Sequence, residues 1–413
     1  MQAEDFKPLK IAAIITEYNP FTKGHAYHIQ QTRQICNPDC IVCILSGNFV
    51  QRGGPAIFHK QLRTSMALAG GADVVFELPT GFATQSAEIF AHGGVALAQE
   101  MGADFLSFGT EAPVALLNRV TDALAEESDE FQHVLKQNLE NKRSFAQSRT
   151  EALNTVLSLT PEEQALIYSP NAILAIEYLL KLKTFKSTIK PITISRKGSH
   201  YSDSSDKVEF PSATAVRRLI YQQDEKKLSD ILPKEVYELL HHHLNHRTNA
   251  EQFYPLIKYA AQMNSAQEIS HICGVFPGME FRISDSVFDA CLSQMIERIH
   301  SKHTTRTAVN RMLFSLLLHI TKENVQNWKS SSESLYLRLL GFRKSAASAV
   351  AYIQKTAHIP VITNVPSYRS QLQDTSLFEL DLLASDIYQT ATGLPDCAGR
   401  PDFVLHPVIF NDC

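Results

Sequence analysis

The sequence predicts an α/β protein with a Rossmann-like parallel sheet, a helical insertion and a mostly helical carboxyl-terminal domain. From Lys10 to Phe108, short apolar runs alternate with amphipathic segments, and each apolar run is continuous rather than alternating. Continuous apolarity is typical of strands covered on both faces, as in a parallel sheet. After Pro233, almost every long segment has the periodicity of a helix.

The first part of the chain contains the expected sheet. Strands are predicted at residues 11–16, 41–45, 74–78 and 105–108, and helices at residues 25–34, 60–69 and 87–100. Successive strand–helix units of roughly 30 residues imply right-handed crossovers. Such a sheet carries its ligand crevice at the carboxyl ends of the strands.

Helices predominate in the remaining sequence. A helical insertion is expected at about 113–168, with helices at 114–127 and 129–140. The first domain then continues with a helix at 171–183, a strand at 192–195 and a helix at 214–222. Further helices are predicted at 235–244, 286–300, 307–320 and 344–355. We therefore expect a catalytic domain at 1–225 and a mostly helical domain at 226–413.

The composition is that of an ordinary globular protein. Among 413 residues, 39 Lys and Arg stand against 43 Asp and Glu, and 44% of the residues are apolar. These values exclude a disordered chain, a collagen-like repeat and a coiled-coil rod. The net charge of −4 disfavours nucleic-acid binding by bulk positive charge, but it leaves room for a local basic face.

Short segments indicate location and redox state. Residues 1–10 lack the apolar core of a secretory signal, and stretches such as 312–320 are far shorter than the roughly 20 residues that span a bilayer. We expect no membrane segment and a cytoplasmic location. Seven cysteines are an odd number in a long chain, which favours reduced thiols over a disulfide framework.

No metal ligand is predicted. Cys36, Cys40 and Cys43 lie close in sequence, but no fourth ligand is near, so ordinary thiols are the favoured interpretation. His242 and His246 have the spacing of a zinc pair on a helix, but no Glu follows His242 as a metalloprotease helix requires. A solvated histidine-rich surface is favoured there.

The loop after the first predicted strand has the parts of a phosphate site. From Glu17 to His25 it reads Glu-Tyr-Asn-Pro-Phe-Thr-Lys-Gly-His, and a helix is expected to begin at about His25. N–H groups at a helix start bind anions, Gly24 lets a ligand approach the backbone, and the side chains of Thr22, Lys23 and His25 add donors. A plain turn followed by a helix cap would account for the spacing equally well.

A second candidate element precedes a later helix. From Pro211 to Arg217 the chain reads Pro-Ser-Ala-Thr-Ala-Val-Arg, a capping-type helix start followed by an arginine. Alone, it is explained by an N-cap and a solvated arginine. Together, the two elements resemble the paired signatures of the HIGH nucleotidyltransferase superfamily, in which the first binds the phosphates of ATP and the second holds the departing pyrophosphate. The resemblance implies ATP with Mg²⁺, and Thr22, His25 and Arg217 as catalytic residues.

Six runs resemble, in order and spacing, the bacterial tRNA(Met) cytidine acetate ligase family. They are EYNPF from Glu17, SGNFVQRG from Ser46, FELP from Phe76, FGTE from Phe108, SPN from Ser169 and SAT from Ser212. The resemblance implies a nucleotidyltransferase-type sheet and an enzyme that activates acetate with ATP and places the acetyl group on N4 of the wobble cytidine of elongator tRNA(Met). Many members have His where this chain has Thr22, whose hydroxyl can still donate to a phosphate oxygen.

The resemblance also implies a set of ATP contacts. They are Ile15, Thr16, Glu17, Tyr18, Asn19, Pro20, Phe21, Thr22, Lys23, Gly24, His25, Ala26, Tyr27, His28, Gly109, Asn171, Arg196, Ser212 and Thr214. A turn glycine at Gly109 and a helix cap at Asn171 remain alternatives. Arg52, in the loop after the second strand, is a further candidate to line the crevice. The implied partners are elongator tRNA(Met) and acetate, and no obligate protein partner is evident.

Charge is partitioned along the second half of the chain. Residues 296–345 contain nine basic residues against three acidic ones, whereas residues 371–413 contain one basic residue against seven acidic ones. A basic helical face beside a catalytic domain could follow an RNA backbone, although a solvated helix surface is the plain alternative. Trp328, Tyr336 and Phe342 lie among these charges, and aromatic residues at this spacing favour a core role over base stacking.

Two other functions remain open from sequence. The same phosphate motifs would suit an adenylyltransferase acting on a small phosphorylated metabolite, which would leave the helical half of the chain unexplained. An RNA-binding protein with a vestigial nucleotide fold is disfavoured because Thr22, Gly24, His25 and Arg217 are all present.

Overall fold

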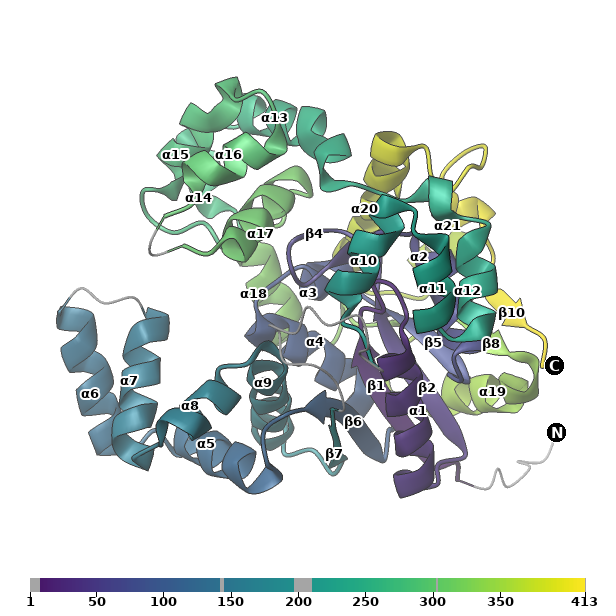
Figure 1. The fold of residues 1–413 in the computed structure, drawn as a ribbon, viewed down its shortest axis with the longest axis horizontal. Helices are drawn as coiled ribbons and strands as arrows, with labels where there is room; N and C mark the ends of the chain where they lie inside the picture. Colours follow the sequence, from purple (N-terminus) through teal and green to yellow (C-terminus); the bar gives the residue numbers. More distant parts are fainter. Residues whose placement is uncertain (1–7, 142–144, 197–209, 302–303, 413) are drawn as a thin grey trace.

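The protein is built around one mostly parallel sheet. The computed structural model describes residues 8–141, 145–196, 210–301 and 304–412. The strands follow the order β10-β8-β5-β2-β1-β6-β7, with β9 paired to β8, and within this sheet the β5–β8 pair is antiparallel (Figure 1). The bounds are β1 Ile11–Thr16, β2 Cys40–Ser46, β5 Val74–Leu78, β6 Phe105–Thr110, β7 Lys190–Ser195, β8 Leu337–Arg343, β9 Val361–Ile362 and β10 Val408–Phe410.

Helices cover both faces of the sheet, which explains the continuous apolar runs. Side chains of β1 alternate between two cores: Ile11 and Ile15 pack on one face, Ala12 and Ile14 on the other. The first core includes helices α4 (Ala87–Glu100) and α9 (Pro170–Thr184), and the second includes α1 (Lys23–Cys36) and α2 (Lys60–Ala69). Because successive side chains on a strand point to opposite faces, a strand covered twice must be apolar throughout.

The predicted elements of the first part of the chain are confirmed. Strands β1 and β5 and helices α2 and α4 have the predicted bounds, while β2, β6 and β7 extend by one or two residues. Helix α1 begins two residues earlier than expected because Thr22, with extended backbone angles, is its N-cap. The loop that follows β1 is correspondingly short.

The expected helical insertion consists of a helical arm. It contains α5 (Val114–Glu126), α6 (Asp129–Glu140), α7 (Phe145–Leu157) and α8 (Pro161–Ile167). Helices α6 and α7 pack on each other as a hairpin that projects away from the sheet (Figure 1). Helix α9 follows the arm and returns the chain to the sheet.

A second group of helices lies between β7 and β8. Helices α10 (Ala213–Gln222), α11 (Glu225–Ile231) and α12 (Lys234–His241) stand beside the sheet, whereas α13 (Tyr254–Met263) to α16 (Leu292–Ile299) form a separate lobe (Figure 1). Helices α17 (Arg306–Leu317) and α18 (Lys322–Ser330) lead back towards the sheet.

The prediction of a single helix at 286–300 is wrong. A short 3-10 turn at Ser286–Phe288 ends at Asp289, and α16 starts only at Leu292. The carboxylate of Glu251 accepts the backbone N–H groups of Leu292 (2.8 Å) and Ser293 (2.9 Å), which satisfies the first donors of a new helix. The break is therefore set by a residue about forty positions earlier in the chain.

The carboxyl-terminal part returns to the sheet, which its helical pattern did not predict. Strand β8 pairs antiparallel with β5, so that Phe342 lies opposite Val74, and β10 pairs with β8 at the sheet edge. Helix α20 (Ser376–Thr392) and the short α21 (Pro401–Val404) lie between them in sequence. Interpreting residues 296–345 as a continuous helical face is wrong, because residues 337–343 are the strand β8.

Among the described helices, no single one is long and apolar enough to cross a membrane. Helices α8 and α9 meet that length and composition only as a pair, and they are bent by 74° at the break between them.

Candidate functional site

The carboxyl ends of the parallel strands bring the predicted site together. The loop after β1 leads into α1, and its Thr22 and His25 form a reciprocal cap. The His25 Nδ1 atom accepts the Thr22 backbone N–H at 3.0 Å, while the Thr22 carbonyl accepts the His25 N–H at 3.0 Å. The two side chains also meet, with Thr22 Oγ1 at 3.3 Å from His25 Nδ1. This capping box fixes the imidazole against the helix start.

The cap determines which nitrogen of His25 carries the proton. Since Nδ1 accepts a backbone N–H, the neutral ring must hold its proton on Nε2. Burial, together with the smaller effects of Arg196 and His28, lowers the pKa of His25 to about 3. His25 is therefore a neutral hydrogen-bond donor at pH 7, which suits a phosphate oxygen.

We expect NMR of histidine-labelled protein to report this state directly. The His25 ring should be the Nε2–H tautomer at pH 7, and its titration midpoint should lie below pH 5. An ordinary histidine, with a pKa near 6.5, would be largely protonated at that pH. Nitrogen-15 shifts followed from pH 8 to pH 4.5 measure both properties, and a midpoint at pH 6 or above would contradict the geometry.

The His25 ring packs against two aromatic side chains. Tyr18 and Phe21 are buried, and their ring centroids lie 4.8 Å and 5.6 Å from that of His25. The Tyr18 hydroxyl lies 3.5 Å from Cys43 Sγ, inside the sheet. These two buried rings therefore position the loop, and their contact with ATP stays a prediction.

The structure brings the second motif onto the first. The Arg217 guanidinium donates to the Asn19 carbonyl oxygen at 2.7 Å and to Thr214 Oγ1 at 3.0 Å. The Ser212 hydroxyl caps α10 by accepting the Ala215 N–H at 3.2 Å. Residues almost two hundred positions apart thus meet at the loop after β1.

A third group lies on the β6 and β7 side of the loop. Glu111 accepts a hydrogen bond from Asn171 Nδ2 at 2.8 Å and pairs with Arg196 Nε at 3.3 Å. Gly109 lies beneath the Arg196 side chain, since a Cβ there would stand 3.3 Å from Arg196 Cγ. Glu111 was not predicted as a site residue, although it belongs to the FGTE run that carried the resemblance. It joins two of the predicted nucleotide contacts.

The remaining predicted contacts occupy the same edge with different roles. His28 Nε2 lies 2.9 Å from the Ser107 hydroxyl, and Tyr27 packs on Phe210. The Lys23 ammonium donates to the Asp230 carbonyl oxygen at 2.5 Å, which directs it towards α11. Ile15 and Thr16 at the end of β1, Pro20 in the loop, and Gly24 and Ala26 at the start of α1 are buried or half-buried.

A buried arginine that the sequence did not single out holds the strand ends together. Arg63, on α2, is completely buried and donates to the Glu17 carbonyl oxygen at 2.6 Å and to the Ser46 carbonyl oxygen at 2.9 Å. It also donates to Gly47 and Phe58 carbonyl oxygens. Because β1 and β2 both end on Arg63, it fixes the spacing between their loops.

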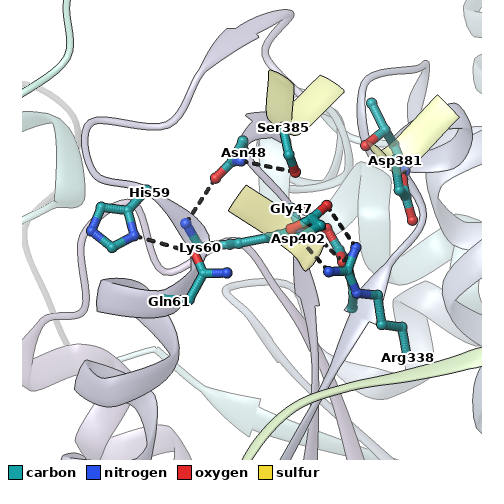
Figure 2. Close-up of polar contacts among 12 residues, drawn as sticks. Gly47, Asn48, His59, Lys60, Gln61, Arg338, Asp381, Ser385 and Asp402 are labelled. Carbon is teal, nitrogen blue, oxygen red and sulfur yellow. Dashed lines mark hydrogen bonds and ion pairs between the residues drawn. The ribbon is translucent and has the colours of Figure 1, made fainter. Parts of the chain in front are cut away.

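Below the loop after β2 lies a buried network of charges (Figure 2). Lys60 Nζ contacts Glu77 Oε1 at 2.8 Å and Asp402 Oδ1 at 3.0 Å, and Arg338 contacts Glu77 at 3.1 Å and Asp402 at 2.9 Å. All four side chains are at most 4% exposed. The network joins α2 and β5 to the carboxyl-terminal β8 and α21.

Asp381 extends this network from α20. It accepts the Thr80 backbone N–H at 2.6 Å and the Tyr336 hydroxyl. Burial, reinforced by the Glu77 carboxylate, raises the pKa of Asp381 to about 7. Burial opposes ionisation of Asp402 too, but Arg338 and Lys60 outweigh it and lower that pKa. The sequence offered only the FELP run as a signal, and Glu77 is its charged member.

The basic segment does not form one face open to RNA. Arg338 is buried in the charge network, Trp328 and Tyr336 are core residues as expected, and Lys302 lies outside the described residues. Several other basic residues are engaged in ion pairs: Arg298 with Asp289, Arg306 with Glu297, Lys329 with Glu88 and Arg343 with Asp412. Part of the opposed charge seen in sequence is thus internal pairing between β8 and the acidic tail.

Among the described residues, no group of three or more His, Cys, Asp or Glu side chains suits a metal ion. Cys36, Cys40 and Cys43 are buried, and burial raises the pKa of Cys43 to about 12. His241 and His242 pack ring against ring near the end of α12.

Comparison with known proteins agrees with this arrangement. A family model described as HIGH Nucleotidyl Transferase matches residues 9–398. A tRNA(Met) cytidine acetate ligase of Thermoanaerobacter sp. (strain X514) is 36% identical over 97% of this chain and 99% of its own. One of Clostridium perfringens (strain SM101) is 34% identical over 98% and 100%.

Solved structures give the same relation. The crystal structure of Thermotoga maritima TmcAL bound with alpha-thio ATP has a TM-score of 0.89 at 29% identity, covering 98% of this chain and 100% of that one. Its apo form gives 0.90 at 30%. The fold and site define a HIGH nucleotidyltransferase. Within that class, the chain belongs to the tRNA(Met) cytidine acetate ligase family.

Proposed function

We propose that the protein activates acetate with ATP and transfers the acetyl group to N4 of the wobble cytidine of elongator tRNA(Met). The observation that carries this proposal is the junction of the two motifs, where Arg217 reaches the loop after β1 beside the capped His25. Full-length relatives with that activity in their names support it, because the helical second half is part of the match. A metabolite adenylyltransferase would leave that half unused.

The chemistry requires positioned donors rather than a protein nucleophile. An acetate oxygen attacks the α-phosphate and pyrophosphate leaves, so that negative charge grows on the phosphate oxygens. We assign stabilisation of that charge to His25 Nε2–H, Thr22, the first N–H groups of α1, and Arg217. Gly109, Asn171 and Arg196, joined by Glu111, would hold the nucleotide on the opposite flank.

The first step produces acetyl-adenylate, a mixed anhydride, from which the acetyl group is transferred to the base. The cytidine amine attacks the acetyl carbonyl carbon, AMP leaves with the electron pair of the broken C–O bond, and the amine loses a proton. Magnesium would enter with the ATP phosphates, because Mg²⁺ usually keeps several waters and is bound through substrate phosphates rather than by an all-protein cage. We place this activity in the cytoplasm, with ATP bound by residues of the segment 1–225 and tRNA contacts that include the segment 226–413.

Two assays on the purified protein test this function. Pyrophosphate–ATP exchange should require acetate, and ATP with labelled acetate should label elongator tRNA(Met) at a single cytidine, which nuclease mapping locates. Pyrophosphate–ATP exchange that does not depend on acetate would overturn the assignment, and so would an acetyl label on another base.

A further inference from the structure

An exposed arginine stands at the tip of the hairpin that follows β2. The hairpin consists of β3 (Phe49–Val50) and β4 (Gly54–Pro55), and Arg52 is at its turn. We propose that Arg52 binds a backbone phosphate of the tRNA next to the target cytidine and so positions the base for acetyl transfer. This inference rests on the proposed function and adds a tRNA-positioning residue to it.

The backbone around Arg52 is fixed on every side. The Gly53 N–H donates to the Val50 carbonyl oxygen at 2.9 Å, and the Gln51 N–H donates to Glu17 Oε1 at 2.7 Å. Gly53 has a φ of +71° and lies against α17, where an added Cβ would stand 2.3 Å from the Arg311 nitrogen. The backbone of the hairpin tip is therefore held in place by Glu17, from the loop after β1, and by Arg311, from the helical half of the chain.

The base of the hairpin rests on aromatic residues of the helical half. Phe49 contacts the rings of Phe253, Phe314 and Tyr388 at centroid distances of 5.6 Å, 5.8 Å and 6.1 Å. The Tyr388 hydroxyl donates to the Ala56 carbonyl oxygen at 3.0 Å. The part of the chain expected to meet tRNA therefore sets the position of the hairpin.

The Arg52 side chain differs from the other arginines at this edge. Arg63 and Arg217 donate to backbone carbonyl oxygens, and Arg311 donates to Gln51. Arg52 is exposed, and within the part of the chain that the structure describes no hydrogen bond or ion pair engages its guanidinium. Its charge acts on the nearby Glu17 carboxylate without pairing to it. A guanidinium with open donors on a fixed backbone suits bidentate binding of phosphate.

The order of the strands places Arg52 on the side of β1 opposite to the predicted nucleotide contacts, where the tRNA cytidine that accepts the acetyl group would lie. The predicted nucleotide contacts Gly109, Asn171 and Arg196 lie after β6 and β7, on one side of β1, whereas the hairpin follows β2 on the other side. We place the entering cytidine on the β2 side, so that its neighbouring phosphates pass the hairpin tip. Phosphate contacts of this kind fix register without reading sequence.

The test compares Arg52→Ala and Arg52→Lys with Arg33→Ala. Arg33 is also exposed, but it pairs with Asp73 at the amino-terminal edge of the sheet, away from the crevice. Binding of fluorescent elongator tRNA(Met) is followed by anisotropy at several KCl concentrations, together with acetate-dependent exchange and acetyl transfer. For Arg52→Ala we expect the Kd for tRNA to rise about tenfold. The slope of log Kd against log KCl concentration should fall by the amount that corresponds to about one phosphate contact.

In the same variant, the rate of acetyl transfer at low tRNA concentration should fall about tenfold because the KM for tRNA rises. The rate of acetate-dependent pyrophosphate–ATP exchange should stay within about twofold of wild type. Lysine should restore part of the binding, and Arg33→Ala should bind normally. Unchanged tRNA binding overturns the proposal, and so does a raised KM for acetate with normal tRNA affinity, which would assign the guanidinium to acetate. If the wild type shows no acetate-dependent exchange, the proposed function fails, and the binding measurements still decide the role of Arg52.

Discussion

Replacing His25 by alanine should lower acetate-dependent pyrophosphate–ATP exchange by at least about 10³-fold. The change removes the Nε2–H donor, and loss of one donor to a developing charge typically costs about 10²- to 10³-fold. It also removes the acceptor that holds the Thr22 backbone N–H at 3.0 Å, so the loop loses its shape as well. Steady-state exchange at saturating ATP and acetate measures the effect.

Two further variants separate chemistry from folding. Glutamine at position 25 can still accept the Thr22 N–H within a capping box, so His25→Gln should fold with near-normal stability and keep only a small part of the activity. His358→Ala alters an exposed histidine beside Glu100 and should leave exchange within about twofold of wild type. Exchange above a tenth of wild type in His25→Ala would rule out the assigned role.

Replacing Lys60 by methionine should destabilise the protein by about 3–5 kcal/mol. The lysine is 1% exposed and sits between Glu77 and Asp402, so its loss leaves two buried carboxylates with Arg338 as their remaining cation. Removing one partner of a buried pair is costly because the other charges stay desolvated. The free energy of unfolding from urea denaturation at pH 7 measures the loss.

A matched control comes from an exposed ion pair. Lys183 pairs with Asp122, and both side chains are about half exposed, so Lys183→Met should change stability by no more than about 1 kcal/mol. Asp402 contacts Lys60 from α21, and the charge of Lys60 lowers the pKa of Asp381 on α20. We therefore also expect Lys60→Met to increase hydrogen exchange in the carboxyl-terminal segment. A loss below about 1 kcal/mol would show that the network is dispensable.

Much of the sheet could be predicted because its signals are local. Four of the five residues from Val74 to Leu78 are apolar, which indicates a strand, and helical periodicity indicates α2 and α4. Strand β8 escaped prediction because Arg338 and Gly341 interrupt its apolar run. Arg338 is satisfied by Glu77 across the sheet, and Gly341 packs against Val408 of β10.

The candidate site divides in the same way. The loop from Glu17 to His25 could be recognised because its residues are contiguous and their spacing carries the chemistry. Glu111 could not be found by that means, since its importance lies in joining Asn171 and Arg196. Arg63 was hidden inside an ordinary helical pattern, because nothing in sequence reveals which carbonyl oxygens a buried arginine will meet.

The parallel sheet could be predicted from the sequence alone, and so could the family, through six runs of residues. The phosphate loop and the late arginine motif could be proposed from the sequence as parts of the site. How these parts lie together required the folded chain: Arg217 on the Asn19 carbonyl oxygen, the neutral tautomer of His25, the charge network below the loop after β2, and the hairpin that presents Arg52. The physical reason is range. Periodicity and capping depend on neighbours a few residues away, whereas a buried charge or a guanidinium is given its role by partners that the fold delivers from hundreds of residues away.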